Sequence, residues 1–220
     1  MFHKLVTVVS LLATAVVAPL GAQDGPKLNF NIGGGISTPL NPTARYVGLS
    51  GNFAAGAGYN IDKHNSIIGE FMWSGLPPNI NALHFPNAPF GSVNLYTLTA
   101  NYRYKLDRLG GSPFGAYLIA GGGWYYRFAS IDKNYVVPPD TVCQPVFTWW
   151  GYACLPSGFV YTATIASRGV SAGGLNGGVG FTVRLGDKGW KFYMESRYHY
   201  AFHPNIATTL VPVTFGIRYN

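Results

Sequence analysis

Charged residues recur at alternate positions within apolar segments of this 220-residue chain. In a β-strand, alternate positions share one face, so these charges would gather on one side of a sheet. Buried charges must be paired, and the planar guanidinium of arginine makes two-pronged hydrogen bonds to carboxylates. We therefore expect the two acids to be ringed by arginines in one lumen charge network, made up of Glu70, Arg103, Arg127, Arg184, Glu195, Arg197 and Arg218.

Two other patterns resemble catalytic motifs but lack the context that catalysis needs. Residues 169–173 (GVSAG) fit the nucleophile-elbow pattern, which requires a strand-to-helix turn, yet glycines follow where that helix would begin. Ser196 and His199 could supply a nucleophile and its base, but residues three apart on a strand point to opposite faces. We therefore expect no catalytic residues, no cofactor and no metal site.

The composition limits the class of protein. Only 10% of the residues are charged, whereas an ordinary soluble domain has about 25%. The 29 glycines and 15 prolines disfavour a helical bundle, and 48% apolar residues disfavour a disordered chain. The basic residues fall mainly on one strand face or in turns rather than in an exposed stripe, so we expect no nucleic-acid partner.

The N-terminus has the pattern of a secretory signal peptide. A basic start at residues 1–4 precedes an apolar run over residues 5–17, and small residues follow up to Ala22. The run is shorter than the stretch of about 20 residues that a membrane-spanning helix needs. We expect cleavage after Ala22, which leaves one mature domain over residues 23–220.

The mature chain alternates between apolar and small or polar residues in eight segments. Their number is even, and their length of about ten residues is that of a membrane β-strand. Short connections alternate with longer ones, which is typical of barrels with short periplasmic turns and long extracellular loops. The predicted strands are 28–37, 52–61, 67–74, 96–105, 117–128, 175–185, 190–200 and 213–219, and residues 130–168 are expected to form a long loop.

A soluble barrel with an apolar ligand cavity would also alternate, so the direction of each face must be argued. The polar face is dominated by Gly, Ala, Ser, Thr and Asn, which would make a poor aqueous exterior. The apolar face has aromatic residues toward the segment ends, as membrane-interface girdles require. We therefore assign the apolar face to lipid and the polar face to the lumen. An eight-stranded lumen is nearly filled by side chains, which favours a plug over a narrow pore for ions or small solutes.

Three segments resemble the outer-membrane β-barrel domain family, the small eight-stranded OmpA/OmpX-type barrels. They are residues 113–123 (PFGAYLIAGGG), 192–198 (FYMESRY) and 213–219 (VTFGIRY). The resemblance implies an all-β, eight-stranded antiparallel up-and-down transmembrane β-barrel in a Gram-negative envelope. Such barrels usually end on an aromatic residue that the barrel assembly machinery reads, whereas here Asn220 follows Tyr219.

The predicted long loop contains both cysteines and a group of aromatic residues. Export to an oxidising envelope favours a disulfide between Cys143 and Cys154. Exposed aromatic residues often mark contact surfaces, so Trp149, Trp150 and Tyr152 are candidate loop contacts. The alternative is that the loop packs onto itself or onto the barrel mouth.

Together these observations predict a monomeric protein of the cell outer membrane, exported through a cleaved signal peptide. Its expected partners are outer-membrane lipid and lipopolysaccharide, the barrel assembly machinery and an extracellular ligand. The expected role is structural or surface interaction through the extracellular loops, with the lumen plugged by the charge network. A narrow pore is the first alternative, and a lipid-modifying outer-membrane enzyme is the less favoured one.

Overall fold

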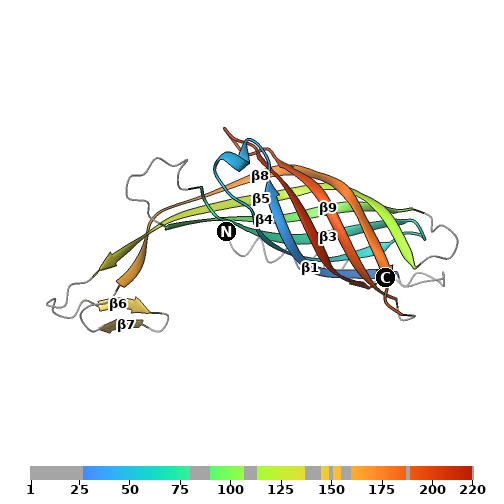
Figure 1. Ribbon diagram of the computed structural model, residues 1–220, viewed down its shortest axis with the longest axis horizontal. Coiled ribbons are helices and arrows are strands. Elements are labelled where there is room, and N and C mark those ends of the chain that lie inside the picture. Colours follow the sequence, from blue (N-terminus) through green and yellow to red (C-terminus); the bar gives the residue numbers. More distant parts are fainter. Residues whose placement is uncertain are drawn as a thin grey trace, which may run out of the picture.

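A computed structural model describes residues 27–79, 90–106, 113–136, 145–148, 151–154, 160–186 and 189–219. Eight antiparallel strands close into a barrel (Figure 1). Around the ring they follow the order β1-β10-β9-β8-β5-β4-β3-β2, so β1 pairs with β10 and β5 pairs with β8. The barrel strands are β1 (Leu28–Pro39), β2 (Ser50–Asn60), β3 (Asn65–Leu76), β4 (Phe90–Lys105), β5 (Phe114–Val136), β8 (Val160–Arg184), β9 (Trp190–Ala201) and β10 (Thr208–Tyr219).

Two smaller elements accompany the barrel. A separate hairpin is formed by β6 (Pro145–Thr148) and β7 (Gly151–Cys154), and a short 3₁₀ helix, η1 (Thr43–Arg45), follows β1. Among the described residues, no helix has the length and apolar character needed to cross a membrane.

The predicted fold class is confirmed. Each of the eight predicted segments lies on a barrel strand and overhangs it by at most one residue, whereas most of the strands extend beyond the predicted bounds. The expected long loop is wrong in part, because β5 continues to Val136 and β8 already begins at Val160. The start of β8, with the sequence VYTATI, is rich in β-branched residues that favour strands.

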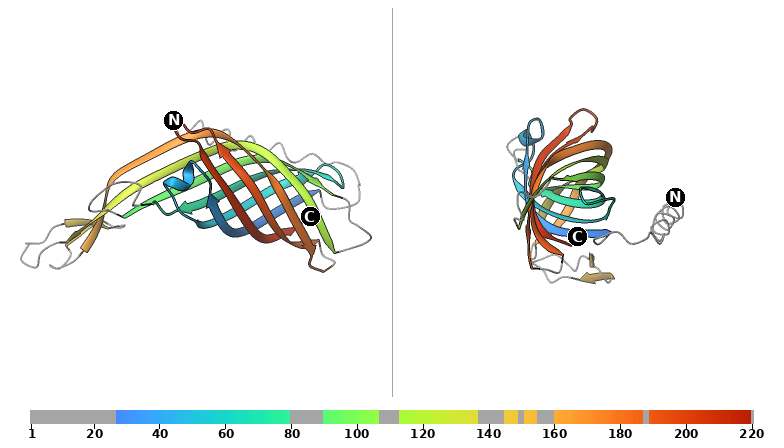
Figure 2. Two further views of the ribbon diagram at one scale, coloured as in Figure 1. Left: turned by 45° about the horizontal axis from the view of Figure 1, so that its top comes forward. Right: turned by 90° about the vertical axis from the view of Figure 1, so that its right-hand side faces the viewer.

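β5 and β8 continue past their neighbours as a two-stranded arm, defined here as residues 132–136 and 160–166. Pairing of β4 with β5 reaches no further than Asp132, and β9 pairs with β8 only from Gly174 onward. A β-bulge at Ile131/Asp132 marks the start of the arm. Figure 2, left, shows β5 and β8 running beyond the other strands.

The two rims of the barrel differ in their connections. At the short-turn rim, few residues separate β2 from β3, β4 from β5 and β8 from β9, and β1 begins and β10 ends there. In the first of these turns the side-chain amide of Asn65, 2.6 Å away, and the backbone N–H groups of His64 and Asn65 donate to the Asp62 carboxylate. These hydrogen bonds lower the pKa of Asp62. The other connections form the long-loop rim.

Burial alternates along the strands with the predicted polarity. The inward face is polar or small, and it includes inward glycines such as Gly121, where a Cβ would collide with the carbonyl oxygen of Ala100 on β4. The outward face of the barrel wall is a belt of exposed apolar side chains. This belt includes Phe30, Ile32, Ile36, Phe71, Leu98, Leu118, Leu175, Val179, Phe181, Phe192, Phe215 and Ile217.

Candidate functional site: a charged cluster in the barrel interior

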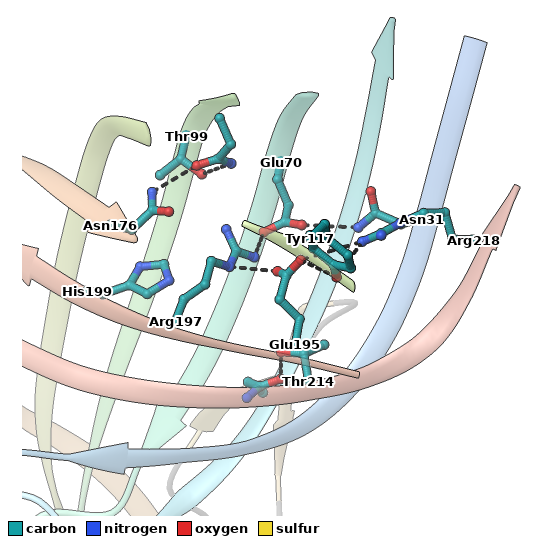
Figure 3. A network of polar contacts seen from close by, with 12 residues as sticks. Asn31, Glu70, Thr99, Tyr117, Asn176, Glu195, Arg197, His199, Thr214 and Arg218 are labelled. Carbon is teal, nitrogen blue, oxygen red and sulfur yellow. Dashed lines mark hydrogen bonds and ion pairs between the residues drawn. The ribbon is translucent and has the colours of Figure 1, made fainter. Parts of the chain in front are cut away.

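Arg197 is the hub of an ion-pair cluster inside the barrel (Figure 3). Its Nη2 contacts Glu70 Oε1, and its Nε lies 2.7 Å from Glu195 Oε1. Glu70 is on β3 and Arg197 is on β9, and these strands lie opposite each other in the closed ring. The contact between them therefore crosses the whole width of the interior.

Further side chains form polar contacts with the carboxylates of Glu195 and Glu70. Tyr117 Oη donates a 2.6 Å hydrogen bond to Glu195 Oε2, and Arg218 Nη2 lies 3.5 Å from the same oxygen. The side-chain amide of Asn31 donates to Glu70 Oε2 at 3.0 Å. We call this group the charged cluster, and its members are Asn31, Glu70, Tyr117, Glu195, Arg197 and Arg218. It ties five strands together, which are β1, β3, β5, β9 and β10.

The four charged members are deeply buried, with at most 3% of each side chain exposed. Removing charges from water costs several kcal/mol for each ion unless partners surround it. Arg218 gains further support from aromatic rings, because its guanidinium carbon lies 4.6 Å from the centre of the Tyr117 ring and 4.5 Å from that of Tyr193. The cluster is therefore a structural cross-link that depends on each of its members.

Arg103 is also buried in the interior, but it stands apart from the ion pairs. Its guanidinium lies 5.2 Å from the centre of the Tyr117 ring. None of its three nitrogens has a hydrogen-bonding partner within the described part of the chain. With Arg197 and Arg218 it makes three buried arginines against the two buried carboxylates of Glu70 and Glu195.

Two predicted members of the network lie elsewhere. Arg184 is exposed at the end of β8, on the short-turn rim. Arg127 is half-buried toward the long-loop rim, where its Nη1 donates to Thr208 Oγ1 at 3.1 Å. The prediction that Arg127 and Arg184 surround the two acids was therefore wrong, because both arginines lie toward the rims of the barrel. Strand alternation identifies the face of a residue, whereas its height along the barrel decides which charges can meet.

Three neutral residues of the interior were absent from the predicted network. Tyr117, Asn31 and Tyr193 all contact charged members of the cluster or lie against them. Each lies on the inward face in the alternation of its strand. A search that paired inward tyrosines and asparagines with inward charges could have found them.

Toward the long-loop rim, the side chains of the interior change from charged to neutral polar and then to apolar. A polar layer follows the charged cluster, in which Tyr125 Oη lies 3.0 Å from His199 Nδ1 and Asn176 donates to Asn101 at 2.9 Å. Beyond it lies a buried apolar layer composed of Val47, Ala54, Met72, Leu76, Leu95 and Leu210. The interior therefore offers side-chain contacts at every level between the two rims.

The catalytic candidates are separated in space. His199 is buried on the inward face of β9, whereas Ser196 lies on the alternate, outward face. Ser171 lies within β8, with strand rather than helix after it. In the part of the chain that the structure describes, no group of three or more His, Cys, Asp or Glu residues is arranged to hold a metal ion.

Several predicted sites lie outside the described residues or have only their backbone described. Cys143, Trp149 and Trp150 lie outside the described residues, as does the predicted signal peptide over 1–22. Tyr152 and Cys154 belong to β7, for which the backbone alone is described. The disulfide and the loop contacts therefore stay predictions.

Comparison with solved structures supports the architecture. Neisserial surface protein A (NspA) matches with a TM-score of 0.55 at 15% sequence identity, over 88% of this chain and 97% of NspA. The chain has the fold of the small eight-stranded outer-membrane β-barrels.

Two further matches have lower TM-scores. The attachment invasion locus protein Ail of Yersinia pestis gives 0.46 at 14% identity, covering 87% of this chain and 97% of Ail. The N-terminal β-barrel domain of Pseudomonas aeruginosa OprF gives 0.42 at 11% identity, covering 89% of this chain and all of that domain, 100%. No family model matches this chain, and no curated protein sequence matches it.

Proposed function

We propose that this protein is an outer-membrane surface protein in which a plugged barrel anchors a projecting arm. The exposed apolar belt would contact the hydrocarbon of the membrane, since soluble monomers rarely expose apolar patches of this extent. Outer-membrane lipid and lipopolysaccharide are the partners of that belt. Export through a cleaved signal peptide and insertion by the barrel assembly machinery belong to this proposal.

The observation that carries the proposal is the length of β5 and β8. β8 has 25 residues and β1 has 12, which at about 3.3 Å per residue gives about 80 Å against about 40 Å. An outer-membrane barrel needs an apolar band only about 25 Å tall. The extra length of β8 therefore serves something outside the membrane.

The surface of the arm suits contact with another molecule. Val136 and Val160 are 72% and 60% exposed, and Tyr135 stacks on Tyr161 with 5.4 Å between ring centres. Thr162 donates to Asn134 across the two strands at 2.7 Å. Such a pair of strands is a stiff support for an exposed apolar surface, and loops on rigid supports are where binding function concentrates. The hairpin β6–β7 lies between the two strands of the arm in the chain, and the predicted Cys143–Cys154 disulfide would constrain it.

Chemical labelling in intact cells tests the orientation. In a chain with both cysteines replaced by serine, Ile165→Cys on the arm and Ile67→Cys on the barrel wall have nearly equal exposure, 50% and 51%. We expect a membrane-impermeant maleimide to label position 165 and not position 67. Labelling of position 165 only after the outer membrane is permeabilised would contradict the proposal.

Photo-crosslinking tests the interaction role. A photoreactive amino acid in place of Val160 on the arm should give a discrete protein adduct in intact cells. The matched control is Leu98 on the barrel wall, because Val160 and Leu98 are 60% and 58% exposed. Equal adduct patterns from both positions, or none from Val160, would count against a surface-interaction role.

Planar-bilayer recording separates the plugged barrel from the alternative of a narrow pore. Because an ion pair spans the interior and an apolar layer lies above it, we expect the wild-type protein to give no conductance steps. Stable single-channel steps from the wild-type protein would favour the pore.

A further inference from the structure

An apolar cup opens at the long-loop rim, on the far side of the apolar layer from the charged cluster. Its volume is about 400 Å³, within the range of small-molecule sites, about 300–1,000 Å³. The cup is formed by the β1–β2 connection, the ends of β3 and β4, the wall of β5 and β8, and the β9–β10 connection. Representative lining residues are Val47, Leu76, Phe90, Arg127, Arg168 and Ile206.

The floor of the cup is mainly apolar. Val47 and Leu76 line the cup and also belong to the buried apolar layer below it, and Val93 packs against that layer. Thr43 and Thr208 are also buried and line the cup, so its floor is mainly rather than wholly apolar. It would stabilise an apolar group by about 25 cal/mol for each Å² of surface removed from water.

Arg127 and Arg168 are the charged residues among the described residues of the cup lining. Ala129 on β5 pairs with Arg168 on β8, and paired residues in an antiparallel sheet share a face. Arg127 is two residues from Ala129 and therefore points to the same, inward side. No Asp or Glu is among the described residues that line the cup, and neither arginine takes part in the ion pairs of the charged cluster.

Two titratable groups near the cup have hydrogen-bonding partners other than these arginines. The Asp132 carboxylate, at the root of the arm, accepts a 2.7 Å hydrogen bond from Thr164 Oγ1 and a 3.5 Å one from Ser130. His203, in the β9–β10 connection, has one ring nitrogen 3.3 Å from the carbonyl oxygen of Val170. Burial and the nearby Arg127 lower the pKa of His203, which disfavours its charged form.

We infer that the cup binds an amphiphilic carboxylate, a molecule with one apolar tail and an anionic head. The tail would lie on the apolar floor, and the head would meet Arg127 and Arg168, whose guanidinium groups suit planar carboxylates. The charge of the pair excludes cationic amphiphiles. The site goes beyond the proposed function, because none of its residues belongs to the arm.

Octanoate binding to the full-length chain in phosphatidylcholine nanodiscs tests this inference. Both rims are accessible in a nanodisc, so the result does not depend on which rim faces outward in the cell. We expect saturable binding in a saturation-transfer NMR titration, corrected with empty nanodiscs. Shortening the tail by two methylenes should weaken binding about tenfold, given about 0.8 kcal/mol per buried CH₂. Octylammonium should not bind.

Charge-removing variants locate the site. Arg127→Gln combined with Arg168→Gln should weaken octanoate binding at least tenfold. The matched control is Arg45→Gln, which removes an exposed positive charge on η1 outside the cup lining and should leave binding unchanged. If the double variant does not fold, Arg168→Gln alone decides the question, because Arg168 is exposed and its replacement should leave the barrel intact.

Three results would overturn the inference. One is the absence of saturable octanoate binding. Another is equal binding of octylammonium, which would indicate partition into lipid. The third is equal affinity in Arg168→Gln and wild type.

Discussion

Arginines meet two different environments inside this barrel. In the charged cluster, Arg197 and Arg218 are almost fully buried, and both contact Glu195. In the cup, Arg127 is half-buried and Arg168 is exposed, and the described residues that line the same space include no carboxylate. The difference teaches that an inward arginine supports the barrel where carboxylates match it and is available to a ligand where none does.

The apolar layer keeps these two environments apart. Met72 and Leu95, 1% and 0% exposed, lie in that layer between the cluster and the cup. No charged residue belongs to this layer, although the buried Ser74 lies between Met72 and Leu76 on β3 and its hydroxyl pairs with that of Ser37. The stability of the barrel and the binding properties of its mouth should therefore respond to different substitutions.

The largest effect is expected from Glu195→Ala, which removes a partner of Arg197, Arg218 and Tyr117 at once. Because two buried cations lose a counter-charge, we expect the free energy of unfolding to fall by about 3–5 kcal/mol. Urea unfolding in lipid vesicles, followed by tryptophan fluorescence, measures it. Glu195→Gln keeps an acceptor for Tyr117 and should lose less. A loss of less than about 1 kcal/mol for Glu195→Ala would mean that the cluster is not a cross-link.

A smaller effect of the opposite sign is expected from Arg103→Met. This residue is the buried arginine without an ion pair, and its nitrogens have no hydrogen-bonding partner in the described residues. Replacing a buried charge by an apolar side chain of similar length is often neutral or stabilising, so the free energy of unfolding should be unchanged or rise by about 1 kcal/mol. The same urea experiment applies. A clear loss of stability would show that Arg103 has a partner of its own.

The smallest effect is expected at Asp62, which lies in the β2–β3 turn, outside both the charged cluster and the cup. Its substitution provides a reference for how the stability of the barrel depends on pH. Hydrogen bonds lower the pKa of Asp62 in the folded state, so its contribution to stability is present above its usual pKa and is lost as the pH falls. Asp62→Asn should therefore reduce stability near pH 7 and lose that difference at low pH. Unfolding measured between pH 7 and pH 3 checks this. A difference that stays constant with pH would assign the effect to the shape of the turn instead.

The alternation of residue types predicted the strands and their faces well, because burial in a barrel follows the two-residue period of the strand. It placed Glu70, Glu195, Arg197 and Arg218 on the inward face together. It could not separate them from Arg127 and Arg184, since the height of a residue depends on the pairing register between strands. That register, such as Phe71 opposite Leu98, comes from the packing of the whole ring.

The alternation of residue types could not predict the arm or the cup, for a different reason. The arm depends on β5 and β8 pairing with each other after β4 and β9 end, which relates segments far apart in the chain. The cup is built from connections that have no regular period. Arg168 gave no signal as a site residue because it fell at the edge of the expected long loop.

The most direct test of the central claim is the same substitution made in both environments. Arg197→Gln and Arg168→Gln each remove one positive charge and keep a polar side chain. If matched arginines support the barrel and unmatched ones do not, Arg197→Gln should lower the free energy of unfolding by about 3–5 kcal/mol, and Arg168→Gln should stay within about 0.5 kcal/mol of wild type. Equal losses in the two variants would contradict the claim.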